Sequence, residues 1–444
     1  MQMPQNPILT LLQNRAGARE KGLYACCSAN EYVIRAALRR AKENDTVALV
    51  EATANQVNQN GGYTGMTPAD FHGFLMALAD EEGMPRAQVL CGGDHLGPLT
   101  WRHLPEAEAM PKAEELVRAY VAAGFSKIHI DTSMRLASDD PAAPLCDAVI
   151  ARRGAQLCRA AEDAFAKYER QHPGSPAPVY VVGSEVPVPG GAQENEDSVA
   201  VTRPQDCEAT LAEFERAFAA QGLSGSWERV VALVVQPGVE FADESVIEYD
   251  RGAAGELTAW LKSRPGLVFE GHSTDYQPRE CLRRMVQDGI AILKVGPALT
   301  FALREALFAL ERIEQELYGM RDLPLSHFRA VLEQAMLEDT AQWAKYYHGS
   351  TAQKRYARAF SYSDRARYYL TGGKVRAAIE TLLKNLDTAG IPLALLSQYL
   401  PVQYARVHTG ALSARAADLL VDRVGDCIDD YLYAVLEKTG RVRQ

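Results

Sequence analysis

The stretch AQVLCGGDHLGP, residues 87–98, is an apolar run that ends in glycines, an acid and an imidazole. A run of this kind favours a parallel strand that is buried on both faces, and the glycines allow the backbone to turn sharply where the strand ends. Seven further runs are similarly apolar. The eight expected strands lie at 23–28, 46–51, 87–92, 126–131, 178–184, 230–236, 266–271 and 291–296.

The intervals between these strands are long enough for crossover helices, and helical patterns occur at 30–43, 68–83, 111–123, 207–221 and 278–288. Eight β/α units within about 315 residues predict a (β/α)8 barrel, or TIM barrel, which carries its active site at the carboxyl ends of the strands. A doubly wound open sheet is the alternative. It is disfavoured because it has no natural limit near eight strands and because no G-x-G-x-x-G motif follows the first strand.

The sequence changes character after about residue 315, where helical patterns continue without strand signals. We expect a barrel domain over 1–315 that holds the functional site, and a helical extension over 316–444 that serves as a lid or a subunit contact. Within the extension, the segment 345–370 is rich in tyrosine and in basic residues. This segment is expected to be a lid, a subunit contact or a solvated connector.

The composition is that of a globular protein, with 47% hydrophobic and 23% charged residues and a formal net charge of −10. An acidic balance argues against nucleic acid or an anionic membrane as a partner. No run approaches the roughly 18 apolar residues of a membrane span, and the first residues lack a signal-peptide pattern, so we expect a cytoplasmic protein. The eight cysteines form no C-x-x-C pair, which argues against a zinc ribbon or a disulfide framework.

Polar residues stand where most of the expected strands end, so a barrel would bring them to one mouth. His95, Glu240 and His272 together predict a three-ligand metal site with open positions for substrate oxygens. We expect Zn²⁺, with Mn²⁺, Co²⁺ or Mg²⁺ as alternatives. For each residue the alternative is a role without a metal, because a lone histidine is often only hydrogen-bonded within the structure and Glu240 can be a surface carboxylate. His129 lies within a strand and is expected to be a core residue or to support a ligand.

Asp94 is the expected general acid or base, because burial beside a metal can tune a carboxylate for proton transfer. A Schiff-base mechanism has little support, since the sixth expected strand contains no lysine. Lys294, on the eighth strand, can serve either as such a lysine or as a phosphate ligand. A kinase is disfavoured because the chain has no G-x-x-x-x-G-K-[ST] motif.

Several segments occur in a familiar order: GGDHLGP, GFSKIHIDTS, GSEVPVPGGAQENED, VVQPGVEF, EGHSTDYQ, LKVGPALTF and, in the extension, YSDRARYYL. On these segments the chain resembles the GatZ/KbaZ family. Members of that family are known as non-catalytic subunits of class II tagatose-bisphosphate aldolase and as D-tagatose 6-phosphate 4-epimerases, and some have been labelled tagatose-6-phosphate kinases.

A more distant similarity to class II aldolases implies roles for individual residues. It implies that Asp94 is catalytic and that His95 is the first zinc ligand. It also implies that Glu185 has a mechanistic role or binds the metal in an alternate position. Glu240 would be a carboxylate ligand in place of the second zinc histidine, and His272 would be the last ligand. The phosphate loop and the asparagine of those enzymes are replaced by STDYQ and Gly296, which argues against cleavage of a bisphosphate.

The resemblance implies a metal-dependent 4-epimerase that works by retro-aldol and aldol steps. Asp94 would then transfer a proton on one face of the sugar, and Glu185, Asp131 or Asp275 would do so on the other face. The expected substrate-binding residues are Ser273, Thr274, Asp275, Lys294, Thr300 and Glu51. The alternative is a stabilising subunit that does no chemistry. The expected partners are a phosphorylated ketohexose, a catalytic aldolase subunit and further copies of the chain.

Overall fold

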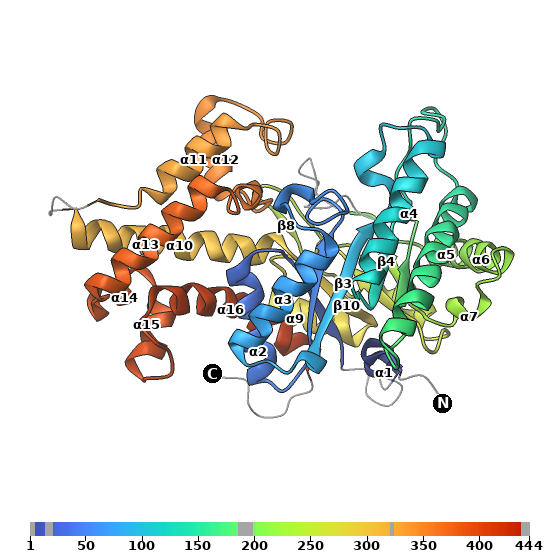
Figure 1. The fold of residues 1–444 in the computed structure, drawn as a ribbon, viewed down its shortest axis with the longest axis horizontal. Helices are drawn as coiled ribbons and strands as arrows, with labels where there is room; N and C mark the ends of the chain where they lie inside the picture. The colour runs from blue at the N-terminus through green and yellow to red at the C-terminus, as the bar shows by residue number, and fades with distance from the viewer. Residues whose placement is uncertain (1–4, 14–20, 185–198, 320–323, 437–444) are drawn as a thin grey trace.

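A computed structural model describes residues 5–13, 21–184, 199–319 and 324–436. In this part of the chain eight parallel strands close into a barrel in the order β1-β10-β9-β6-β5-β4-β3-β2 (Figure 1). The expected (β/α)8 barrel is therefore confirmed, and its closure excludes the open sheet. The barrel strands are β1 (Leu23–Cys27), β2 (Ala48–Thr53), β3 (Val89–Leu96), β4 (Lys127–Ile130), β5 (Val179–Val182), β6 (Val230–Val235), β9 (Val268–Gly271) and β10 (Ile290–Val295).

Helices cover the outside of the barrel, and a short antiparallel hairpin, β7 (Glu240–Phe241) with β8 (Val246–Ile247), follows β6. The helices up to the last strand are α1 (Pro7–Gln13), α2 (Glu31–Glu43), α3 (Pro68–Glu82), α4 (Glu106–Ala122), α5 (Asp147–Gln171), α6 (Pro204–Ala220), α7 (Ser224–Trp227), α8 (Gly255–Leu261) and α9 (Arg279–Gln287). The 3-10 turns here are η2 (Gly62–Thr64), η3 (Arg86–Gln88) and η4 (Pro98–Trp101).

The long helix α5 is not among the helices expected from the sequence. Its buried face consists largely of small residues such as Ala151, Ala155, Ala161 and Ala164. Ile150, Leu157 and Phe165 share this buried face, so the helix is amphipathic. The alanines are buried because α5 packs closely against α4 and α6.

The barrel interior is apolar at its amino-terminal end. Leu23, Leu49, Leu90 and Ile292 from four strands form one cluster there with Ile8 of α1, which closes this end. Alternate residues of a strand share a face. The next inward positions on β2 and β10 are therefore Glu51 and Lys294, and the interior becomes polar toward the carboxyl ends of the strands.

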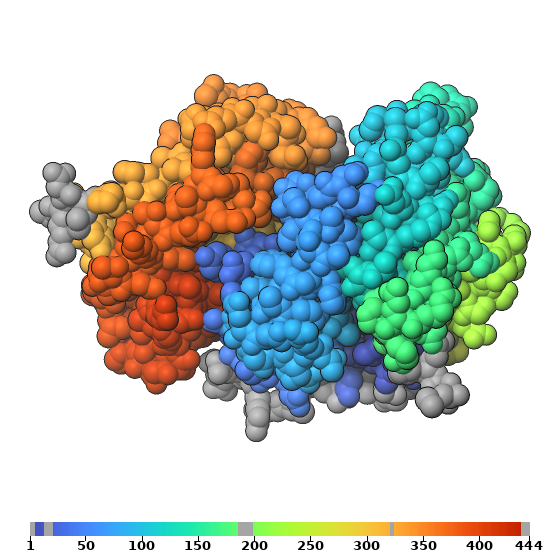
Figure 2. All heavy atoms as spheres, viewed as in Figure 1, coloured from blue at the N-terminus to red at the C-terminus, as the bar shows by residue number. Residues whose placement is uncertain are grey.

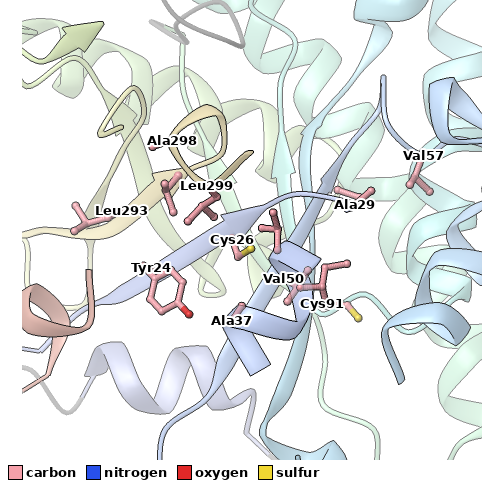
Figure 3. Close-up of a cluster of buried hydrophobic side chains, with 14 of the residues drawn as sticks. Tyr24, Cys26, Ala29, Ala37, Val50, Val57, Cys91, Leu293, Ala298 and Leu299 are labelled. Carbon is pink, nitrogen blue, oxygen red and sulfur yellow. The ribbon is translucent and has the colours of Figure 1, made fainter. Parts of the chain in front are cut away.

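The other faces of the strands form the main core with the surrounding helices (Figure 3). Cys26 of β1 and Val50 of β2 face Ala37 of α2, and Leu293 of β10 lies near Leu299 of the helix that follows it. All these side chains are buried. Strands buried on both faces explain why the sequence shows apolar runs rather than an alternating pattern.

The helices that follow β10 pack beside α2 and α9, away from α4–α6 (Figure 1). They are α10 (Pro297–Tyr318), α11 (Phe328–Glu338), α12 (Thr351–Phe360), η5 (Arg365–Tyr368), α13 (Gly373–Ala389), α14 (Leu393–Tyr399), α15 (Pro401–His408) and α16 (Ala416–Val435). This helical extension forms a continuous surface with the amino-terminal part of the barrel (Figure 2).

The extension is joined closely to the barrel. Helix α10 runs through residues 315 and 316, where the expected domain division lies, and α16 packs against α2, α9 and α10. The hydroxyl of Tyr431 in α16 donates a hydrogen bond to the carbonyl of Thr274, at 2.8 Å. Among the described residues, no helix is both long and apolar enough to cross a membrane.

Candidate functional site

Three imidazoles lie together at the carboxyl ends of the barrel strands. His95 belongs to β3, His129 to β4, and His272 directly follows β9. The ring centre of His95 is 4.9 Å from each of the other two, and the centres of His129 and His272 are 5.1 Å apart. All three side chains are buried. The barrel therefore builds a compact cluster from residues that are far apart in the chain.

Asp94 and His95 are consecutive, yet both side chains belong to this cluster. In a regular strand consecutive residues point to opposite faces. His95 has φ of +49°, and the pairing of β3 with β4 shifts register between Gly93 and Leu96. Such a bulge changes the direction of the side chains around it. The left-handed conformation of a non-glycine residue is unfavourable by itself and is typical of functional sites.

The glycine that precedes this bulge makes room for the charged interior. A Cβ atom on Gly92 would lie 2.6 Å from Oε1 of Glu51, closer than such contacts occur. Gly92 is paired with Glu51 across the β2–β3 ladder. The close approach of this side chain therefore requires glycine at residue 92.

Asp131 orients His95. Its Oδ2 lies 2.8 Å from Nδ1 of His95, and its Oδ1 accepts hydrogen bonds from the backbone N–H and the hydroxyl of Ser133. Burial alone would raise the pKa of Asp131, but His95, His129 and Ser133 lower it to about 2. An ionised carboxylate on Nδ1 leaves Nε2 of His95 as the ligand atom, which is the usual arrangement behind a metal-binding histidine.

His129 and His272 have imidazole atoms suited to bind a cation. Nε2 of His129 is buried and has no hydrogen-bond partner among the described residues, while its Nδ1 lies 3.1 Å from Oδ1 of Asp94. The backbone N of His95 also lies 3.2 Å from this Nδ1. In the tautomer that donates its Nδ1 proton to Asp94, the lone pair of Nε2 is free to bind a cation. Burial lowers the pKa of His272 to about 3, although Glu270 acts in the opposite direction. His272 is therefore neutral, as a metal ligand must be.

Beneath the imidazoles lies a layer of buried charges. Nζ of Lys127 is 2.7 Å from Glu51 and 2.6 Å from Glu270, and Nζ of Lys294 is 2.6 Å from Asp94 and also contacts Glu51. Burial raises the pKa of Asp94 and of Glu270, but the neighbouring lysines outweigh it and keep both pKa values well below the ordinary range. The layer therefore consists of ionised pairs that stabilise one another in a dry interior.

Donor atoms of Asp94, His95, His129 and His272 all lie within 4.8 Å of one another. Imidazole nitrogens with one carboxylate are the donor set that Zn²⁺ and related divalent ions prefer. The orphaned Nε2 of His129 and the carboxylate behind His95 add to this fit. The described residues can therefore hold a divalent metal, although the donor set does not identify which one.

The cluster opens into a cavity at the mouth of the barrel. Asp94, His95, His272 and Lys294 line its barrel side, and Arg367 of the extension lines it as well. The cavity thus joins a metal-binding group, ionised carboxylates and cations in one space. This is a suitable environment for a small anionic substrate that changes protonation during a reaction.

Comparison with known proteins places the chain in a family. The model of the family described as D-tagatose-1,6-bisphosphate aldolase subunit GatZ/KbaZ-like matches residues 8–436, nearly the whole chain. This chain belongs to the GatZ/KbaZ-like family. The resemblance inferred from the sequence motifs is thereby confirmed.

One solved structure agrees with this membership. A structure titled as a probable tagatose 6 phosphate kinase from Sinorhizobium meliloti 1021 is 46% identical to this GatZ/KbaZ-like chain, with a TM-score of 0.84 over 94% of this chain and 100% of that one. A more remote match is the fructuronate-tagaturonate epimerase UxaE from Cohnella laeviribosi, which is 12% identical with a TM-score of 0.44 over 95% of this chain and 83% of that one. Another is a putative fructose-1,6-biphosphate aldolase from Coccidioides immitis, which is 15% identical with a TM-score of 0.40 over 86% of this chain and 96% of that one.

Of the three expected metal ligands of the GatZ/KbaZ-like chain, the structure brings His95 and His272 together. Glu240 is not a member of that group. It begins the β7–β8 hairpin, is only half-buried, and its Oε1 accepts a hydrogen bond from the backbone N–H of Phe241 at 2.9 Å. The place expected for Glu240 is taken by His129. Ligation by Glu240 remains a prediction from the sequence.

The expected catalytic residues lie in different surroundings. Asp94 is in the cluster, and Asp131 supports it through His95. Glu185 lies outside the described residues. Asp275 lines the cavity, and its Oδ1 accepts hydrogen bonds from the backbone N–H groups of Gly296 and Ala298. Burial raises the pKa of Asp275 to about 6.

Some of the expected substrate-binding residues line the cavity, and others lie around it. Ser273 and Lys294 line the cavity, whereas Glu51 lies below them in the charged layer. The hydroxyl of Thr274 donates to the carbonyl of Lys294, and that of Thr300 contacts Asp364 of the extension at 2.6 Å. The two threonines therefore hold the structure around the cavity together.

Sequence reasoning missed Lys127, Glu270 and Arg367 and gave His129 a supporting place only. A signal for the first residues exists, because Lys127, His129 and Asp131 alternate along one strand and therefore share a face. Glu270 and His272 alternate in the same way. Five charged or imidazole side chains at alternating positions that face into a barrel would have indicated a polar interior. No local signal assigns Arg367 to this cavity.

Proposed function

We propose that this protein is a metal-dependent 4-epimerase of a ketohexose phosphate, which interconverts tagatose 6-phosphate and fructose 6-phosphate. The observation that carries the proposal is the convergence of three imidazoles and the carboxylate of Asp94 in one cluster, of which Asp94, His95 and His272 line the cavity. Retro-aldol chemistry needs a Lewis acid beside a group that takes a hydroxyl proton. The cluster offers side chains that would hold the Lewis acid and has Asp94 among them as the proton acceptor.

His95, His129 and His272 are the side chains that would hold the ion, with Asp94 beside them. A divalent metal at this position supplies a Lewis acid that polarises the ketose carbonyl. Asp131 keeps His95 in the required orientation through the contact at Nδ1. The layer of Glu51, Lys127 and Glu270 fixes the floor of the site by ion pairs.

Asp94 accepts the proton of the C4 hydroxyl while the bond between C3 and C4 breaks. The electrons of that bond pass to the ketose fragment as an enediolate, and C4 becomes the aldehyde carbon of glyceraldehyde 3-phosphate. Rotation of the aldehyde and re-addition then invert C4, with a proton returned to its oxygen on the other face. Glu185 is the proposed donor there, because Asp131 and Asp275 already bond His95 and backbone N–H groups.

A stabilising subunit of a class II aldolase is the second candidate. The family description, which names an aldolase subunit, favours it. A subunit without chemistry gains little from an orphaned imidazole nitrogen in a cluster of metal ligands, whereas an enzyme needs one. The epimerase therefore requires the metal-binding cluster, whereas the stabilising subunit does not.

The test is an assay of the purified chain alone, with Zn²⁺, Mn²⁺, Co²⁺ or Mg²⁺ added after chelation. NMR of the sugar phosphates should show formation of tagatose 6-phosphate from fructose 6-phosphate. His272→Ala and Asp94→Asn should abolish it, because they remove a metal-binding side chain and the proton acceptor. His103→Ala, at an exposed histidine, is the matched control.

An inert chain that raises the activity of an aldolase subunit in a mixture would refute the epimerase and support the accessory role. Retention of that stimulation by His272→Ala would show that the accessory role does not use the cluster. Activity that is the same with and without chelator would contradict the metal dependence.

A further inference from the structure

The extension places a short segment at the mouth of the barrel, residues 361–368, which we call the rim segment. Two loops of the barrel hold it. The hydroxyls of Ser361 and Ser363 donate to Oδ1 of Asp243, at 2.6 and 2.8 Å, and the hydroxyl of Tyr276 donates to the carbonyl of Tyr362 at 2.6 Å. Asp243 follows the β7 strand, and Tyr276 follows β9. The rim segment is therefore attached to the same loops that surround the cavity.

A buried ion pair fixes the segment from below. Asp364 accepts hydrogen bonds from Nε of Arg304 at 2.8 Å and from the hydroxyl of Thr300 at 2.6 Å. Arg304 and Asp364 are 1% and 2% exposed, so this pair is shielded from water. Both oxygens of Asp364 thus accept hydrogen bonds from side chains of α10.

Arg367, three residues after Asp364, lines the cavity together with Tyr368. Its Nη1 donates to the carbonyls of Ser363 and Asp364, and its Nη2 donates to the hydroxyl of Tyr368 at 3.0 Å. A guanidinium has five N–H donors. Two of them, on Nε and Nη2, have no acceptor among the described residues, which is the number needed for a two-bond contact with a phosphate or a carboxylate.

The charge of Arg367 has no carboxylate partner within 4.0 Å among the described residues. Lys294, which lines the same cavity, differs because Asp94 lies 2.6 Å from its Nζ. Two carboxylates also line the cavity, but Asp94 is paired with that lysine and Asp275 accepts two backbone N–H groups. Arg367 therefore offers positive charge that no carboxylate in the described part of the chain pairs with directly.

A second arginine strengthens this positive region. Arg365 is 4% exposed, its Nε has no hydrogen-bond partner in the described part of the chain, and its guanidinium lies over the ring of Tyr346. Burial would raise the pKa of Tyr368, yet Arg367 and Arg365 lower it below its ordinary value. In a chain of net charge −10, a buried and a half-buried arginine that form no ion pair among the described residues point to an anionic ligand.

We propose that Arg367 binds the phosphate group of the sugar phosphate, so that the helical extension supplies the phosphate subsite of the barrel. This inference rests on the proposed function for the identity of the sugar. Tyr368 and Tyr63, whose rings meet edge to face at 4.9 Å, close the cavity beside the guanidinium. Lys294, one of the residues expected to bind phosphate from the sequence, instead pairs with Asp94 and Glu51 at the floor.

Equilibrium binding, measured by calorimetry on the full chain, tests the subsite without requiring turnover. The ligands are fructose 6-phosphate, fructose and inorganic phosphate. Arg367→Gln should weaken binding of fructose 6-phosphate by about tenfold to a hundredfold, the effect of losing charge-assisted hydrogen bonds. It should leave the affinity for fructose unchanged. Arg376→Gln removes the same charge from an exposed position of the extension and should change neither ligand.

Arg367→Lys keeps the charge and removes the planar fork, so its affinity for fructose 6-phosphate should fall between those of wild type and Arg367→Gln. It is also the deciding variant if Arg367→Gln does not fold. In the wild-type chain, fructose 6-phosphate but not fructose should protect Arg367 from an arginine-directed dicarbonyl reagent, as followed by mass spectrometry. Binding of inorganic phosphate alone, without preference for the sugar phosphate, would indicate a free-phosphate site and overturn the proposal.

Unchanged affinity for fructose 6-phosphate in a folded Arg367 variant would also overturn the subsite, even if the chain is an epimerase. Conversely, a chain that binds fructose 6-phosphate through Arg367 and does not epimerise it would refute the proposed function alone. Failure of the wild-type chain to bind either phosphate compound would refute the subsite directly.

Discussion

Oδ2 of Asp131 lies 2.8 Å from Nδ1 of His95, and this contact directs the other imidazole nitrogen toward the cluster. A carboxylate in this position orients a metal-binding histidine and makes it a better donor. Asp131→Asn should therefore lower the affinity for a divalent metal by about tenfold to a hundredfold. Competition with a chromophoric chelator measures it. Asp140→Asn, at an exposed aspartate, is the control, and equal affinities of the two variants would contradict the role of Asp131.

The third ligand is decided by comparing His129 with Glu240. His129 belongs to the donor group and has an orphaned Nε2, whereas Glu240 is outside the group. His129→Ala should abolish the rise in melting temperature that added metal produces, because a ligand that binds only the folded state stabilises it. Glu240→Gln should retain that rise. The opposite pair of results would restore the ligand set expected from the sequence.

Gly92→Ala should destabilise the barrel. The added Cβ would lie 2.6 Å from Oε1 of Glu51, which is fully buried and paired with Lys127. Overpacking of such a site costs about 1–3 kcal/mol, measurable as a lower midpoint in urea. Gly73→Ala is the matched control, because its Cβ meets nothing within 4 Å and it lies inside α3. Alanine is the better helix former, so that variant should be as stable as wild type or slightly more stable.

Asp364→Asn should release the rim segment from α10. Asparagine tolerates the φ of +42° found here, so the change removes the charge and keeps the backbone conformation. Arg304 would remain buried without a counter-charge, at a cost of about 3 kcal/mol. Urea-induced unfolding measures the loss of stability. If Asp364→Asn is no less stable than Asp250→Asn, at an exposed aspartate, the ion pair does not stabilise the extension.

The contact between α2 and α16 should make stability depend on pH. Burial alone would raise the pKa of Asp422, but Arg40 and Arg406 outweigh it and hold the pKa below its ordinary value. Nη2 of Arg40 lies 2.9 Å from Oδ1 of Asp422. Because the pKa is lower in the folded state than in the unfolded state, this stabilisation is present above about pH 4 and is lost as the pH falls toward the folded-state pKa.

Asp422→Asn should therefore lower the free energy of unfolding by about 3 kcal/mol at neutral pH, as expected when one partner of a buried ion pair is removed. The difference from wild type should shrink below about pH 4, where the carboxyl group of the wild type becomes protonated. Unfolding in urea at a series of pH values provides the measurement. A difference that stays constant across the series would show that charge on Asp422 is not the cause.

Much of the fold was predictable because its signals are local. Each strand is a short apolar run, and a run buried on both faces has this appearance wherever it occurs in a chain. The order of strands and helices then restricts the architecture to very few choices. His95 and His272 were identified in the same way, since each follows an apolar run and has glycine and acid neighbours.

The rest of the site depends on contacts between distant parts of the chain. The bulge that turns both Asp94 and His95 into the cluster exists because of how β3 pairs with β4. The donor group contains His129, which lies in barrel strand β4, and not Glu240, which begins the β7–β8 hairpin. Neither feature has a periodicity along the sequence that would reveal it.

By itself, the sequence determined the eight-stranded barrel, the helical extension and the family, since these follow from hydrophobic runs and motifs that neighbouring residues specify. Only the tertiary structure decided which side chains share the cavity. Barrel closure gathers imidazoles and charges from separate strands, and packing of the extension adds Arg367 to them. The physical reason is that burial patterns are encoded locally, whereas the distance between two side chains depends on how the whole chain packs.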